Sequence, residues 1–161
     1  VCVCVCVCVC CQSADIDERA IRREKPEELV KALAEAKADA IKLNLVDGCA
    51  DRDIRDPPTL LITSDQVVVS KGVIRERPRS MEEAREFIKA YSGDRALAVN
   101  YVLLTNLSTG ATKGGWDIPE ICFHHIPVEF IEEVVGTADG VRGLPRELTE
   151  KLIRESLEVN S

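Results

Sequence analysis

Asp65 is the residue whose type and position in this sequence most suggest chemistry. It interrupts an apolar, β-branched stretch, with Leu60-Leu61-Ile62 before it and Val67-Val68-Val69 after it. The preceding Asp56-Pro57-Pro58 marks where a strand would begin. A carboxylate inside a buried strand has to be paired with a cation, hydrated or bound to a metal ion. The alternative is a turn at Ser64-Asp65 between two strands, in which both side chains bond to their own backbone.

Lys37 is the second candidate, because it lies on the apolar face of a predicted helix. Pro26 is a favourable first helical residue and Glu27 and Glu28 suit the helix dipole, so we expect a helix over residues 26–42. At about 100° per residue, Lys37 falls in the middle of an apolar arc formed by Leu29, Val30, Leu33, Ala36, Ala40 and Ile41. Such a lysine either extends to the rim of the buried face or is a cation directed into a cleft.

Other charged residues near these two are weaker candidates when each is taken alone. Asp15 and Asp17 share a face if their segment is extended, and with Glu18 they could hold a divalent cation. Acidic clusters of this kind usually face water. Arg75 and Arg77 likewise share a face of an extended segment that follows Asp65, although charged hairpin ends are common.

The first twelve residues have a composition unlike the rest of the chain. Six of the eight cysteines lie in the alternating Val-Cys run of residues 1–11, which a repeated GTGTGT tract would encode. We therefore interpret residues 1–12 as a non-native tract and residues 13–161 as a single, incomplete domain. Alternate cysteines without a second pair do not form a zinc module, and Cys49 and Cys122 are isolated, so no disulfide framework is expected.

Composition limits the classes of partner. The 161 residues are 45% hydrophobic and 30% charged, which suits one domain with a buried core. The net charge of -7 argues against general affinity for nucleic acid or an anionic membrane, while a small anion in a local cationic pocket stays compatible. No apolar run approaches the roughly 20 residues that span a bilayer. We expect a cytoplasmic protein.

Helical and extended segments alternate, which predicts an α/β fold with three layers and a mixed, elongated sheet. Ser80 and Glu83 form a capping box for a helix over residues 80–92. A long strand is expected at residues 96–106, a turn at 108–110 and a partner strand at 121–126. Two further segments, 127–135 and 145–157, are expected to be helical. We expect Asp65 at a strand end that lines a central cleft.

Several short motifs resemble the Maf family of nucleoside triphosphate pyrophosphatases, over about residues 14–156. They follow the family order: Asp-Ile-Asp-Glu at 15–18, Pro-Glu-Glu-Leu at 26–29, Ala-Glu-Ala-Lys-Ala at 34–38, Ser-Asp-Gln-Val at 64–67, Arg-Pro at 77–78, Glu-Glu-Ala at 82–84, Tyr-Ser-Gly at 91–93 and Gly-Leu-Pro at 143–145. Lys-Gly-Gly-Trp-Asp at 113–117 looks like the plant branch.

The resemblance implies roles for individual residues. Asp65 matches the proposed proton acceptor, and Lys37 and Arg77 match cations that bind the substrate. Asp17 and Glu18 match acids near a Mg²⁺ site, to which Asp65 could also contribute. The implied reaction releases pyrophosphate from a nucleoside triphosphate, with no nucleic-acid or membrane partner and with a homodimer as a further expectation.

The resemblance also bears on the substrate and on the completeness of the site. Asp-Gln rather than Asp-Thr resembles the 7-methyl-GTP subgroup, which makes Gln66 a base-selecting candidate.

The family begins with a strand and a Ser-x-Ser-x-x-Arg-Arg phosphate-binding turn, where this chain has the Val-Cys tract, and a further family segment is missing near residue 133. The family's usual lysine before Pro78 is Arg77 here, which keeps the charge but changes its geometry. We expect weak or no turnover. The alternative function is an inactive binding or dimerising partner.

Overall fold

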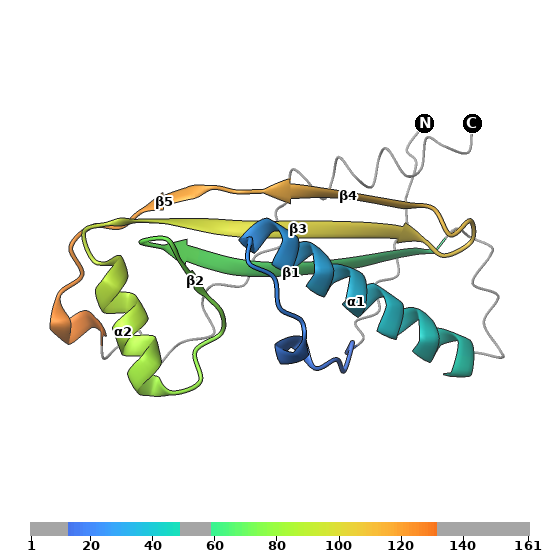
Figure 1. Cartoon of the computed structure of the whole chain (residues 1–161), viewed down its shortest axis with the longest axis horizontal. Helices are drawn as coiled ribbons and strands as arrows, with labels where there is room; N and C mark the ends of the chain where they lie inside the picture. The colour runs from blue at the N-terminus through green and yellow to red at the C-terminus, as the bar shows by residue number, and fades with distance from the viewer. Residues whose placement is uncertain (1–12, 49–58, 132–161) are drawn as a thin grey trace, which may run out of the picture.

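The computed structural model describes residues 13–48 and 59–131, and these form a long sheet with helices beside it (Figure 1). The strand order is β2 (Val73–Arg75), β1 (Leu60–Ser70), β3 (Arg95–Asn106) and β4 (Thr112–Asp117), and β5 (Glu120–Cys122) also pairs with β3. The predicted α/β class, an elongated sheet with flanking helices, is confirmed. Every pairing between described strands is antiparallel, so these residues contain no parallel pair.

Strand β1 runs without a break through Asp65, so the turn considered for Ser64-Asp65 is wrong. Asp65 lies in the middle of this strand, so the strand end predicted for it is wrong as well. It pairs with β3 in one register, from Leu60 opposite Asn106 to Ser70 opposite Ala96. This ladder satisfies the backbone groups on one edge of β1 and keeps the polar Ser-Asp pair extended. Because side chains alternate along a regular strand, neighbouring residues of β1 point to opposite faces of the sheet.

The predicted partner of the long strand was only partly right. From the expected range 121–126, only the start belongs to a strand, as β5, which pairs with β3 through Arg95 to Leu97. Most of β3 pairs instead with β4, which contains Gly114 and Gly115. Glycines are depleted in strands, so β4 gave no strand pattern. Here a glycine is needed, because a Cβ at position 114 would overlap the hydroxyl and ring of Tyr101.

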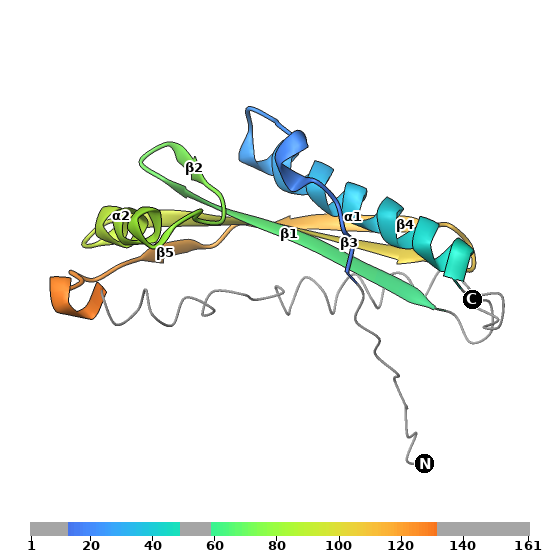
Figure 2. The same ribbon diagram turned by 90° about the horizontal axis from the view of Figure 1, so that it is seen from below.

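Helix α1 (Pro26–Gly48) lies along one face of the sheet and is longer than the predicted 26–42 (Figure 2). Its buried face packs on β1 and β3 to form the main core cluster: Leu29, Val30, Leu33, Ala34, Ala38, Val67, Val99, Tyr101 and Leu103. The buried arc is turned slightly from the predicted one, since Ala34 and Ala38 replace Ala36 and Ala40. Lys37 still falls in its middle, as predicted.

Helix α2 (Met81–Tyr91) lies near β2 and β5, at the other end of the sheet from α1 in Figure 1. The predicted N-cap is confirmed, since the Ser80 hydroxyl accepts a hydrogen bond from the Glu83 backbone N–H. The return bond differs, because the Glu83 carboxylate accepts from Arg79 N at 2.6 Å. Residues 128–131 are helical, as expected. The rest of the predicted helix 127–135, the helix 145–157 and the tract 1–12 lie outside the described residues.

Candidate functional site

Three chain segments meet at the ammonium group of Lys37. Its Nζ donates to Asp65 Oδ1 at 2.5 Å and lies 2.9 Å from Glu18 Oε1. Lys37 comes from the middle of α1, Asp65 from β1, and Glu18 opens the short 3-10 helix η1 (Glu18–Ala20). The sequence-predicted proton acceptor, one substrate cation and one metal-site acid therefore share one contact cluster.

Lys37 stays charged in this cluster. Its side chain is only 19% exposed. Burial by itself lowers the pKa of Lys37, but the hydrogen bonds and negative charges of Asp65 and Glu18 together outweigh burial, and the pKa is raised above its ordinary value. The lysine is therefore a buried, paired cation, and it does not extend to the rim of the helix as a surface lysine would.

Asp65 is the most enclosed acid of the cluster, with a side chain 12% exposed. Burial raises its pKa; the Lys37 ammonium lowers it again, and the charges of Glu18 and Glu76 add to the rise, so the net shift is upward. Asp65 and Glu18 place two negative charges on one ammonium. A carboxylate held in this way is a stronger base than an ordinary aspartate and is poised to accept a proton or a cation.

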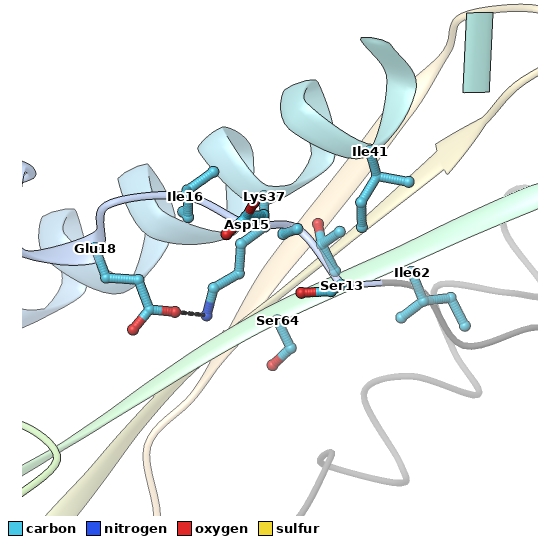
Figure 3. A pocket seen from close by; sticks show the side chains of 10 residues that line it. Ser13, Asp15, Ile16, Glu18, Lys37, Ile41, Ile62 and Ser64 are labelled. Carbon is cyan, nitrogen blue, oxygen red and sulfur yellow. Dashed lines mark ion pairs between the residues drawn. The ribbon is translucent and has the colours of Figure 1, made fainter. Parts of the chain in front are cut away.

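A cavity of about 470 Å³ opens beside the cluster. Figure 3 shows the Glu18 carboxylate meeting the Lys37 ammonium at its wall, with Ser13, Ser64 and Ile41 also among the lining residues. The extended N-terminal segment forms one wall and α1 and β1 form the others. Asp65 is not one of the lining residues; it contacts the lining residue Lys37. The volume is within the range of small-ligand pockets.

Asp17 is placed differently from Glu18. Its carboxylate caps η1 by accepting a hydrogen bond from Arg19 N at 3.1 Å. This cap fixes the turn from which Glu18 reaches Lys37, so Asp17 supports the geometry of the neighbouring acid. Asp15 lies on the cavity wall with a positive φ of 41°, a conformation that aspartate tolerates better than most residues. The metal role predicted for Asp17 stays a prediction.

The predicted substrate cation Arg77 is exposed and follows β2, and no hydrogen bond or ion pair joins it to the cluster. Its neighbours are engaged elsewhere. Glu76 forms an ion pair with Arg22 at 3.1 Å, and the Arg75 guanidinium lies 4.7 Å from the centre of the Phe87 ring. Sequence reasoning missed the Arg22–Glu76 pair, because nothing local links residues 54 positions apart.

Gln66 does not share the face of Asp65. Thr63 and Val67, which flank Asp65 at two-residue spacing, both contact the α1 side of the sheet. In the unbroken β1 strand Gln66 therefore points to the opposite face, where its register partner on β3 is the buried Asn100. The structure brings Lys37, Asp65 and Glu18 together and leaves Gln66 and Arg77 apart from them.

Glu18 and Asp65 are the carboxylates of the cluster that would hold a magnesium ion. Within residues 13–48 and 59–131 no group of three or more His, Cys, Asp or Glu side chains is arranged to hold a metal. Mg²⁺, however, is commonly bound through one or two carboxylates, with water and substrate phosphates completing its shell. The two acids carry one negative charge more than Lys37 offsets, but the Lys37 ammonium occupies the point where they meet. Magnesium at these two acids therefore stays a prediction.

Comparisons with known proteins identify the family of this chain. The family described as "Maf-like protein" matches residues 5–141. A 7-methyl-GTP pyrophosphatase of Dictyostelium discoideum is 32% identical over 168 aligned positions, covering 89% of this chain and 84% of that protein. A 7-methyl-GTP pyrophosphatase of Pseudomonas syringae is 38% identical, covering 62% of this chain and 46% of that protein. A dTTP/UTP pyrophosphatase of Alkaliphilus metalliredigens is 25% identical, covering 91% of this chain and 74% of that protein. Because the family match covers most of this chain, and the Dictyostelium protein is similar over most of both chains, the chain belongs to the Maf-like protein family.

Proposed function

We propose that this chain is a nucleoside triphosphate pyrophosphatase, which hydrolyses the bond between the α and β phosphates. The observation that carries the proposal is the contact of Lys37 with both Asp65 and Glu18 beside the cavity. A base, a cation and a second acid within one contact distance are the groups that this hydrolysis needs. Relatives named as pyrophosphatases support the same reaction.

In the proposed mechanism a water molecule attacks the α phosphorus and pyrophosphate leaves as the α–β bridging P–O bond breaks. Asp65 accepts the water's proton, and its raised pKa makes it a better acceptor than an ordinary aspartate. Lys37 holds Asp65 in place and offers its ammonium to phosphate oxygens. A Mg²⁺ ion held by Glu18 and Asp65 would offset the charge that builds on the phosphates.

Arg77, Gln66 and Asp17 have proposed roles that need more than the described contacts. Arg77, on an exposed segment after β2, would turn toward the phosphates when substrate binds. Gln66 would select the base, on the sheet face opposite the cluster. Asp17 would support the magnesium site through η1. A homodimer and a cytoplasmic location, both expected from the sequence, stay predictions.

The proposed substrate is a modified or non-canonical nucleotide, with 7-methyl-GTP as the first candidate. Relatives in Dictyostelium and Pseudomonas carry that name, and the Asp65-Gln66 pair resembles that subgroup. Among the described residues no helix has the length and apolarity to cross a membrane. Because the net charge is -7, the protein has no general attraction for a nucleic-acid strand, and a single nucleotide is the better ligand.

The test is release of pyrophosphate from 7-methyl-GTP, GTP, dTTP and UTP, measured with and without Mg²⁺. We expect weak, magnesium-dependent release that is fastest with 7-methyl-GTP. No release from any of the four would contradict the proposal in favour of the alternative, an inactive binding or dimerising partner. In the same panel, Gln66→Thr should move the preference from 7-methyl-GTP toward the pyrimidine nucleotides. An unchanged preference in that variant would remove Gln66 from base selection while leaving the reaction itself standing.

A further inference from the structure

Thr63 makes the buried side-chain hydrogen bond between β1 and α1 that lies nearest the cluster. Its Oγ1 donates to the backbone carbonyl of Ala34 at 2.9 Å, and Thr63 is only 6% exposed. The acceptor is a mid-helix carbonyl, which already has its helical partner four residues on. The bond is therefore an addition to the helix ladder, and it joins two segments that are 29 residues apart.

The two ends of this bond are closely related to the two members of the buried ion pair. Thr63 lies two residues before Asp65, on the same face of β1. Ala34 lies three residues before Lys37 in α1, and helical side chains lean toward the N-terminus, so the Lys37 stem runs back over the Ala34 turn. The Thr63–Ala34 bond and the Lys37–Asp65 pair are thus adjacent ties between the same helix and the same strand.

Most of the remaining contacts of α1 with the sheet are apolar and do not fix the position of the helix along its axis. Another directional contact, from the Trp116 indole N–H to the Glu27 carbonyl at 3.2 Å, lies in the first turn of α1, away from Lys37. Leu29, Val30 and Leu33 pack on Val99, Tyr101 and Leu103, and such burial is non-directional. Ala34 and Ala38 are fully buried and short, which brings the helix close to the sheet but leaves no interlocking side chain at this turn. A hydrogen bond from one hydroxyl to one carbonyl is directional, so it fixes the position of α1 relative to β1.

We propose that Thr63 is a positioning residue for the reaction. Its bond to Ala34 holds α1 at the position on β1 where Lys37 contacts Asp65. This inference rests on the proposed function for its effect on turnover. Its effect on the ion pair is independent of turnover, because the pair exists in the protein without substrate.

The matched variants are Thr63→Val and Thr63→Ser. Valine keeps the β-branched shape and removes the donor, and Ala34 keeps its helical bond, so no buried carbonyl is left without a partner. Serine keeps the donor and loses a methyl group. We expect Thr63→Val to lower kcat about 10- to 100-fold with a much smaller change in KM, since small misplacements of positioned groups cost rates of this size. Thr63→Ser should keep kcat close to that of the wild type.

A double-mutant cycle tests the positioning without using turnover. The urea midpoint of unfolding is measured for Thr63→Val in the wild-type chain and in a Lys37→Met chain. We expect a smaller midpoint shift in the Lys37→Met chain, where there is no ion pair left to align. The control is Lys42→Met, which removes a lysine of the same helix whose ion pair is with Asp39, also on α1. In the Lys42→Met chain, Thr63→Val should shift the urea midpoint as much as it does in the wild-type chain.

The outcomes separate the two proposals. Equal midpoint shifts in the wild-type and Lys37→Met chains would overturn the positioning role, whatever the rates are. Wild-type turnover with an unchanged kcat in Thr63→Val would overturn it as well. A wild-type chain without turnover would overturn the proposed function, while unequal midpoint shifts in the cycle would still support the role of Thr63.

Discussion

Lys37 holds two carboxylates with one ammonium, and this imbalance governs how the cluster ionises. The pKa of Lys37 is raised and that of Asp65 is raised too, although the two form an ion pair. The reason is that burial disfavours the charged Asp65 and that Glu18 and Glu76 add negative charge around it. A further cation beside the two carboxylates would therefore lower the pKa of Asp65 again.

The raised pKa of Lys37 predicts a change of stability at alkaline pH. A cation whose folded pKa lies above its ordinary value of 10.5 contributes stability that is fully present below that value. The contribution is lost as the pH rises through the raised pKa. We expect the wild type to exceed Lys37→Met in free energy of unfolding at about pH 9 and the difference to shrink by about pH 12.

This difference is measured by urea unfolding of both proteins at each pH. Lys31→Met is the matched control, since Lys31 lies on the same helix and forms a more exposed ion pair, with Glu35 at 3.9 Å. Its difference from the wild type should change little between the two pH values. A Lys37→Met difference that is constant or grows with pH would show that Lys37 is not a stabilised cation in the folded protein.

At the scale of elements, β4 depends on a close approach between a glycine and a ring. Tyr101 on β3 lies over Gly114 of β4, and it also contacts Trp116, with ring centres 4.9 Å apart. The Trp116 indole N–H donates to the backbone carbonyl of Glu27 at 3.2 Å. Strand β4 thus connects the sheet to the first turn of α1, the helix that carries Lys37.

Gly114→Ala should destabilise the protein, because the added methyl group would overlap Tyr101 and force the ring away from the core. Overpacking of this kind costs about 1–3 kcal/mol in free energy of unfolding. Thr112→Ala, an exposed change on the same strand, should cost much less. Thermal unfolding of both variants makes the comparison. Equal stability of Gly114→Ala and Thr112→Ala would mean that Tyr101 moves aside without cost.

The sequence predicted those parts of the elements that depend on local patterns. The position of Lys37 on the buried face followed from helical periodicity, and the cap at Ser80 followed from the Ser-x-x-Glu spacing. Strand β4 could not be predicted, because the reason for its glycines is a ring on another strand. That Gln66 and Asp65 point to opposite faces could not be predicted, because it depends on β1 being continuous. The pairing of β1 with β3 shows that continuity.

At the scale of the whole molecule, the meeting of Glu18, Lys37 and Asp65 depends on tertiary packing. The three residues were candidates from sequence, but their contact depends on how α1 packs on β1 and on the segment before α1, which brings Glu18 to Lys37. Long-range ties such as Arg22 to Glu76 have no local signature. The net charge of -7 does not attract an anionic nucleotide, so binding depends on the cations placed locally at the site.

The central claim is that Asp65 is kept in a buried, charged cluster for catalysis at some cost to stability. Because burial raises the pKa of Asp65, with the charges of Glu18 and Glu76 adding to the rise, the stability linked to its protonation is present below its ordinary pKa and is lost as the pH rises through the raised value. Removing the charge should therefore separate activity from stability, as expected for functional sites.

The most direct test compares Asp65→Asn with Asp39→Asn, the same change at an exposed aspartate of α1. Release of pyrophosphate from 7-methyl-GTP with Mg²⁺ and the urea midpoint at pH 7 are measured on the same samples. We predict that Asp65→Asn loses at least about 100-fold in kcat while its midpoint is equal to or above that of the wild type, and that Asp39→Asn keeps the wild-type rate. An Asp65→Asn protein with the wild-type rate, or one whose lost rate is matched by a lower midpoint, would contradict the account.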